Sequence, residues 1–183
     1  MYKSGHKGIN MILFSPILFI MIILDFIIVG LLSAFIIFYF ASLPDKDLDT
    51  RLLTHRGFTH TYSFSICIGI LFGFISLIFT NISINIGLLE PTLFNLIFFT
   101  FWGVFVGVFT ILGQIAGDIL TPTGVKIFQK PKGIPDLPIF KDKKYTLDLI
   151  PASNTWANAG FFISGILCIS LSIFAGIYIN ILI

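Results

Sequence analysis

Charged residues are scarce in this chain of 183 residues, where Asp, Glu, Lys and Arg together make up 11% of the sequence. A soluble domain carries about 25% charged residues, and the mean hydropathy here is +1.01. The composition therefore excludes an ordinary soluble protein and predicts an integral membrane protein, surrounded by membrane lipids. The net charge is only +2, so we expect no nucleic-acid binding. The length fits a single membrane domain, residues 1–183.

Cysteine is also rare. The two cysteines, Cys67 and Cys168, lie inside apolar runs and are expected to be small buried residues. Their spacing fits neither a zinc motif nor a disulfide framework. A metal site in this chain would therefore have to use histidine and carboxylate ligands.

A calcium loop is excluded by two missing residues. Asp45, Asp47 and Asp49 alternate as at the start of such a loop. The sixth position of the loop must be Gly and the twelfth must be Glu. Here those positions hold Thr50 and Arg56, so we reject this interpretation of the acidic run.

Long apolar stretches are present at Ile9–Ala41, Tyr62–Thr80, Leu93–Ile119 and Ala157–Ile183. A spanning helix needs about 20 residues, so each of the last three fits one helix. The first is too long for one ordinary span. It contains Asp25 near its middle, and a carboxylate at the bilayer centre costs about 2.5–3.5 kcal/mol. This favours a hairpin turning near Asp25 over the alternative, an intramembrane ion or proton site in a small transporter.

We therefore predict an all-α, polytopic membrane bundle of about five helices, in which the first two form a short hairpin and a polar end lies on one membrane face. Two small-xxx-small pairs, Gly103/Gly107 and Gly113/Gly117, are expected to serve helix packing. The first helix is expected to begin after an N-cap at Ser4, the second to end near Ser42, and the third to start near His60. A turn on the far side is expected over Asn81–Pro91, a loop on the near face over residues 121–154, and the last helix from about Trp156.

The histidines and most carboxylates are expected at one end of this bundle. If Ile9–Ala41 crossed the membrane once, His6 and Asp45 would lie about 30 Å apart, whereas a hairpin returns both to one face. Imidazole and carboxylate groups are the ligands of zinc and similar divalent ions, and a catalytic zinc site uses about three of them and keeps a position for water. We predict metal ligation by His6, Asp45, His60 and Asp118, and we include Gln114 in the metal site because it shares a helix face with Asp118 at i,i+4.

Three further residues are candidates for chemistry around the ion. His55 and His60 are five residues apart, which is about 140° around a helix, so one helix cannot aim both at one ion. His55 is therefore predicted to be a second-ion ligand or an acid–base group, and Asp47 a general base or second-ion ligand. Arg56 could clamp a phosphoryl oxygen or simply anchor the chain at the membrane face.

The basic residues indicate the orientation. All eleven Lys and Arg residues fall at the expected ligand end, whereas the opposite turns carry Asp25 and Glu90. By the positive-inside rule, the ligand end is predicted to be cytoplasmic. The C-terminus of this multi-pass cell-membrane protein is then predicted to lie outside.

Several motifs resemble one family in order and spacing. They are Gly5-His6, Leu43-Pro44-Asp45-Lys46-Asp47, His55-Arg56-Gly57-Phe58-Thr59-His60 and Asp118-Ile119-Leu120-Thr121-Pro122-Thr123-Gly124-Val125. The chain resembles the YdjM-like inner-membrane proteins, which are described as membrane-bound metal-dependent hydrolases. The resemblance implies a divalent ion, zinc first, and a phosphoester or lipid-like substrate. The ligand order is also similar, more loosely, to that of zinc-dependent phospholipase C and P1 nuclease.

The chain departs from this pattern at two places. The family places His where this chain has Gln114, and a neutral amide is a poorer zinc ligand than imidazole. It also places an acid near the start of the last helix, where this chain has Asn154 and Asn158. These departures imply fewer metal ions, a harder ion such as Mg²⁺ or Mn²⁺, or lost activity. A non-catalytic membrane protein with a structural metal or a partner-docking site is therefore the alternative, and the sequence leaves the oligomeric state open.

Overall fold

The computed structural model describes residues 1–45, 57–129 and 143–182, and these residues form an all-helical bundle. Its α-helices are α1 (Lys3–Ile23), α2 (Ile27–Phe40), α3 (Tyr62–Asn85), α4 (Leu93–Ile119) and α5 (Thr155–Leu182), and a short 3₁₀ turn, η2 (Phe58–His60), precedes α3. Four of the helices are long and apolar enough to cross a membrane, and α2 is shorter. The predicted fold class of a five-helix membrane bundle is confirmed.

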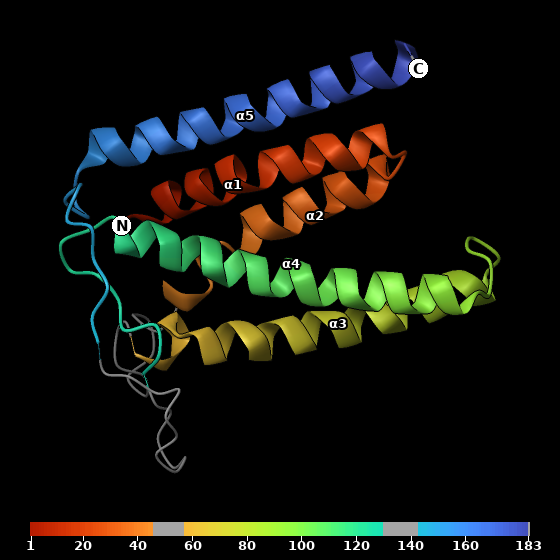
Figure 1. Cartoon of the computed structure of the whole chain (residues 1–183), viewed down its shortest axis with the longest axis horizontal. Helices are drawn as coiled ribbons and strands as arrows, with labels where there is room; N and C mark the ends of the chain where they lie inside the picture. The colour runs from red at the N-terminus through yellow and green to blue at the C-terminus, as the bar shows by residue number, and fades with distance from the viewer. Residues whose placement is uncertain (46–56, 130–142, 183) are drawn as a thin grey trace.

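The helices are arranged as two packed groups (Figure 1). α1 lies along α5, and α2 folds back against α1. α3 lies along α4, and contacts between α1 or α2 and α4 join the groups less extensively. We call these groups the α1–α2–α5 half and the α3–α4 half.

Glycines bring the helices of each half into close contact. A Cβ added to Gly165 of α5 would lie 2.7 Å from the carbonyl oxygen of Gly8 of α1. A Cβ at Gly107 of α4 would lie 2.9 Å from the Cα of Gly69 of α3. Lipid tails are as apolar as the helices, so close packing at small residues holds membrane helices together where hydrophobic burial cannot. Gly107 thus serves helix packing, as expected from the sequence.

The first apolar stretch is a hairpin, as predicted from Asp25. α1 ends at Ile23 and α2 begins at Ile27, and Asp25 between them has a φ of 63°. The Asn180 amide of α5 donates hydrogen bonds to the Ile22 carbonyl at 3.1 Å and to Asp25 Oδ1 at 2.9 Å. Asp25 is exposed at the tip of this turn, so the turn interpretation holds and the transporter hypothesis loses its basis.

Some boundaries differ from the prediction. The N-cap of α1 is Tyr2, so Ser4 already lies within the helix. α3 continues to Asn85 instead of ending near Thr80, because polar residues there remain helical; the Asn81 amide donates to the Leu77 carbonyl one turn earlier. Cys67 is exposed on α3, which corrects the expectation that it is buried.

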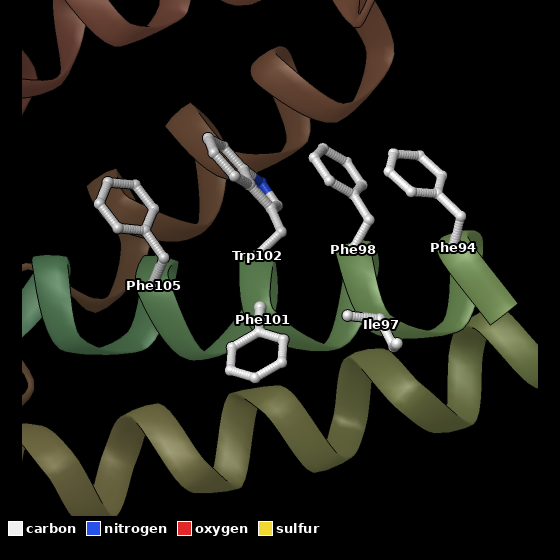
Figure 2. Close-up of a pocket in the computed structure, with 6 residues that line it drawn as sticks. All are labelled: Phe94, Ile97, Phe98, Phe101, Trp102 and Phe105. Carbon is white, nitrogen blue, oxygen red and sulfur yellow. The ribbon is translucent and has the colours of Figure 1, made fainter.

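An apolar groove of about 470 Å³ lies on the first half of α4, away from the polar end (Figure 2). Its lining includes Phe98, which stacks on Phe26 of the hairpin turn with ring centroids 5.3 Å apart. The Trp102 indole donates a hydrogen bond to Ser33 Oγ of α2 at 2.8 Å. The groove therefore belongs to the lipid-facing and helix-packing surface. The full lining is Phe94, Ile97, Phe98, Phe101, Trp102 and Phe105.

Candidate metal centre

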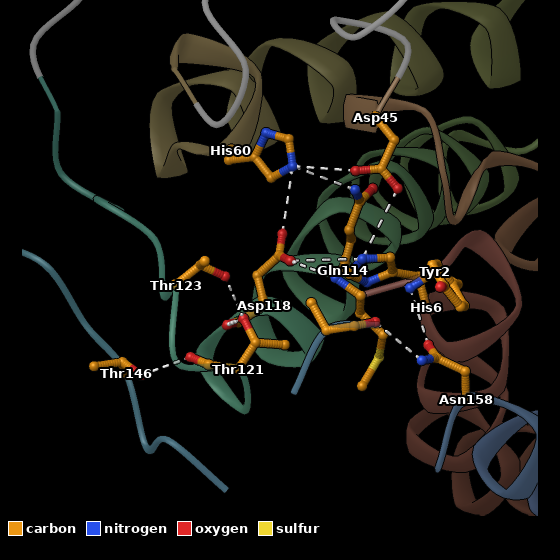
Figure 3. A network of polar contacts seen from close by, with 12 residues as sticks. Tyr2, His6, Asp45, His60, Gln114, Asp118, Thr121, Thr123, Thr146 and Asn158 are labelled. Atoms are coloured by element: carbon orange, nitrogen blue, oxygen red, sulfur yellow. Dashed lines mark hydrogen bonds and ion pairs between the residues drawn. The ribbon is translucent and has the colours of Figure 1, made fainter. Parts of the chain in front are cut away.

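Four side chains at one end of the bundle form a ring in which imidazoles and carboxylates alternate (Figure 3). His6 Nε2 lies 3.6 Å from Asp118 Oδ1 and 3.8 Å from Asp45 Oδ2. His60 Nε2 lies 3.3 Å from Asp118 Oδ2 and 3.4 Å from Asp45 Oδ1. Each carboxylate therefore faces both imidazoles, one with each oxygen. The structure brings together all four ligands proposed from the sequence.

The ring is almost closed to solvent. His6 and His60 are 0% exposed, Asp118 is 1% exposed and Asp45 is 6% exposed. Both ring nitrogens of His6 lack a hydrogen-bond partner among the residues that the structure describes. A buried imidazole without partners is costly, so the chemistry of this donor set fits a cation at the centre of the ring.

The first turn of α1 positions His6. The Tyr2 N–H donates to Asn158 Oδ1 of α5 at 2.9 Å, and the Asn158 amide donates to the Ala152 and Asn154 carbonyls. Asn158 thus joins the first turn of α5 to the start of α1, because its carbonyl oxygen and its amide group are both hydrogen-bonded to backbone. Asn158, one of the two asparagines near the start of the last helix, therefore has a structural role in this chain.

The 3₁₀ turn η2 positions His60. The Thr59 hydroxyl lies 3.0 Å from His60 Nδ1. When Nδ1 carries the ring proton, it donates to this hydroxyl, and the lone pair of Nε2 then points at the two carboxylates. Metal-binding histidines have their second nitrogen fixed in this way. Sequence reasoning did not single out Thr59, although its place directly before His60 was the signal.

The last turn of α4 positions Asp118, and a following segment caps that turn. The Leu147 N–H donates to the Ile119 carbonyl at 2.7 Å, and the Leu149 N–H donates to the Leu120 carbonyl at 3.0 Å. The Thr121 hydroxyl donates to the carbonyl of Asp118 itself at 2.8 Å. The last carbonyls of a helix need such partners, so these bonds fix the turn that carries the carboxylate. The Met1 amino group lies 3.5 Å from Asp118 Oδ1.

Asp45 enters the ring from the segment after α2. Burial alone raises the pKa of its carboxyl. In the protein without a metal ion, a His60 that carries a proton on Nε2 donates a hydrogen bond to Asp45, and this bond and the charges of His6 and His60 outweigh burial and hold that pKa below its usual value. Asp45 is therefore an anion at neutral pH, as a metal ligand must be.

Gln114 lies one turn before Asp118 and is fully buried beside the ring. Its Nε2 lies 3.5 Å from His60 Nε2, and its Oε1 lacks a hydrogen-bond partner within the described residues. The amide thus adjoins the ring through His60, and its predicted place in the metal site stays a prediction. Asp47, His55 and Arg56 lie outside the described residues, so their predicted roles stay predictions.

The contact distances within the ring are close to those between the ligands of a zinc site, but they do not all match. No group of three or more His, Cys, Asp or Glu side chains in residues 1–45, 57–129 and 143–182 has the arrangement of a complete metal centre. Ligand atoms about 2.0–2.1 Å from a tetrahedral zinc lie about 3.3–3.4 Å from one another. The two contacts of His60 match this distance, and the two contacts of His6, at 3.6 and 3.8 Å, are longer. Binding of an ion requires the His6 side to close inward.

The bundle and its buried polar end define a polytopic membrane protein with a histidine–carboxylate cluster. The chain belongs to the YdjM inner membrane protein family, whose profile matches residues 12–181. The match covers Asp45, His60 and Asp118, and it begins after His6. Searches of curated proteins and of solved structures found no match.

Proposed function

We propose that the protein is a membrane-bound hydrolase that depends on a divalent ion, zinc first, held by His6, Asp45, His60 and Asp118. The observation that carries the proposal is the alternating ring, because imidazole nitrogens and carboxylate oxygens are zinc ligands and here four of them surround one point. A bound divalent ion would supply an activated water at neutral pH. A phosphoester, lipid-like in view of the membrane setting, is the proposed substrate class.

The chain's own residues have distinct parts in this proposal. Thr59 keeps the Nε2 lone pair of His60 directed at the ring, and the capped end of α4 holds Asp118. Asp47 or His55 would act as the general base, and Arg56 would stabilise an anionic transition state. These last three roles rest on the sequence and on the family resemblance.

The test combines metal analysis with hydrolysis assays on the purified protein. Wild type should contain about one zinc per chain and hydrolyse phosphodiester or phospholipid substrates. The His60→Ala variant should lose the metal and the activity together, since it removes a fully buried ligand. A wild-type protein that takes up neither zinc, Mg²⁺ nor Mn²⁺ would refute the proposal.

A structural metal is the second candidate function, and burial favours it. The four ring members are at most 6% exposed, and four protein ligands fill a tetrahedral shell as in structural zinc sites, which are closed. Replacing zinc with Co²⁺ and adding azide separates the candidates. A change in the visible spectrum would indicate an open position and support the hydrolase, and an unchanged spectrum with no turnover would support the structural role.

We also propose that the ring end faces the cytoplasm. The described basic residues at that end are Lys3, Lys7, Lys126, Lys143 and Lys144, and an excess of basic residues is typical of cytoplasmic loops. In a background without native cysteines, Leu88→Cys in the far turn should react with an impermeant thiol reagent on intact cells. Leu149→Cys at the ring end should react only after lysis, and the reverse pattern would invert the orientation. Both leucines are well exposed, at 73% and 65%.

A further inference from the structure

The four ring members are divided evenly between the two halves of the bundle. His6 lies on α1 and Asp45 follows α2, so both belong to the α1–α2–α5 half. His60 lies in η2 directly before α3, and Asp118 lies on α4, so both belong to the α3–α4 half. Two of the four contacts, His6–Asp118 and Asp45–His60, therefore cross between the halves.

Close glycine contacts and hydrogen bonds join the helices within each half, and both stabilise helix pairs in a membrane. Gly8 and Gly165 bring α1 and α5 into backbone contact, and glycines of α3 and α4 do the same in the other half. Hydrogen bonds add to this inside each half, for example from the Ser76 hydroxyl of α3 to the Phe99 carbonyl of α4 at 2.6 Å. Each half is thus fastened by interactions that lipid cannot replace.

Among the described residues, the boundary between the halves has close glycine contacts only toward its ring end, where Gly113 and Gly117 of α4 lie against Asn10 and His6 of α1. Farther from the ring, it depends more on apolar side chains. Phe14, Leu18 and Ile37 of the α1–α2–α5 half pack against Val106 of α4 in one core cluster. Lipid tails offer such side chains an equally apolar surrounding, so these contacts provide little net drive for association in a bilayer. The Trp102–Ser33 hydrogen bond fastens the middle of this boundary, and the ring lies at its polar end.

We infer that a divalent ion in the ring acts as a clamp that joins the two halves. Without a divalent ion, two carboxylates from different halves face the buried imidazoles, and the single positive charge of the Met1 amino group, 3.5 Å from Asp118 Oδ1, cannot balance both of them. Two buried carboxylates without a matching positive charge are unfavourable. With the ion bound, both halves supply two ligands each, so separation of the halves would break the coordination shell. The clamp rests on metal binding at the proposed site, but not on hydrolysis, and it would operate in either candidate function.

The native cysteines make the clamp measurable. Cys67 lies on α3 near the ring end, and Trp156, at the start of α5, is 88% exposed. In a Cys168→Ser background, spin labels on Cys67 and Trp156→Cys report the separation of the two halves by pulsed electron spin resonance. A second pair, Cys67 with Phe101→Cys, reports a distance inside the α3–α4 half and is the control.

The label distance across the halves should be narrow with zinc and should broaden and lengthen after chelation. The control pair should not change, and His60→Ala should abolish the effect of zinc. At a zinc concentration of about 100 times Kd, the ratio of folded to unfolded protein should rise about 100-fold over the chelated sample.

Three outcomes separate the inference from the proposed function. An unchanged distance between the halves, with loss of metal verified by elemental analysis, would overturn the clamp and leave the hydrolase standing. A zinc-dependent distance without any hydrolysis would establish the clamp and count against the hydrolase. A protein that binds neither zinc, Mg²⁺ nor Mn²⁺ would overturn both.

Discussion

Replacing Asp118 by Asn should lower the affinity for zinc by more than about 100-fold. Loss of an outer partner of a metal ligand already costs about 10–100-fold, and Asp118 is in direct contact with both imidazoles of the ring. The substitution keeps the volume and one carbonyl oxygen but removes the negative charge. It thus tests the ligand role with little change in packing. Competition with a coloured chelator on the purified protein gives the affinity.

Asp148 provides a matched control for this experiment. It is exposed at the same end of the bundle, in the segment before α5, and its φ is 51°. Asn tolerates this left-handed conformation well, so Asp148→Asn removes the same charge without strain. Its zinc affinity should equal that of wild type. If Asp118→Asn and wild type had equal zinc affinities, Asp118 would not be a zinc ligand, and the ring would have a role other than metal binding.

The helical framework could be predicted from the sequence because the bilayer restricts what a chain can do. A carboxylate at position 25 is unfavourable at the centre of a span, which led to the prediction of the hairpin. The apolar run Leu93–Ile119 coincides with α4. Hydropathy failed at the end of α3. There Asn81 satisfies its own polar group by bonding to the preceding turn, so a polar residue did not end the helix.

The grouping of the four ring residues was predictable for the same reason, since the hairpin leaves few ways to place His6 and Asp45. The supporting residues were not. Asn158 was noted in the sequence only as one of two asparagines near the start of the last helix, and its bonds to Tyr2, Ala152 and Asn154 show that it holds backbone in place. These contacts join residues up to 156 positions apart, and no local pattern in a single sequence reports them.

Gly117→Ala is expected to weaken zinc binding by about 10–100-fold, the range typical of outer positions in metal sites. A Cβ at Gly117 would lie 2.8 Å from His6 Nδ1 and 3.3 Å from His6 Cε1. The added methyl group must push the imidazole away from α4. His6 already makes the longest contacts of the ring, at 3.6 and 3.8 Å, and must move inward to bind an ion. Gly117 is thus a positioning residue, in addition to its expected role in helix packing.

Two other glycines separate this local effect from damage to the bundle. Nothing lies within 4 Å of a Cβ at Gly160, so Gly160→Ala should leave zinc affinity unchanged and should not lower the thermal midpoint, because Ala favours the helix over Gly. A Cβ at Gly103 would lie 2.7 Å from the Phe72 carbonyl oxygen, so Gly103→Ala should lower the thermal midpoint while the folded protein keeps its zinc affinity. A double-mutant cycle then isolates the contact with the imidazole. In a His6→Ala background, the Gly117→Ala change should no longer affect zinc binding, whereas a penalty of the same size would mean that the methyl group acts through the helix and not through His6.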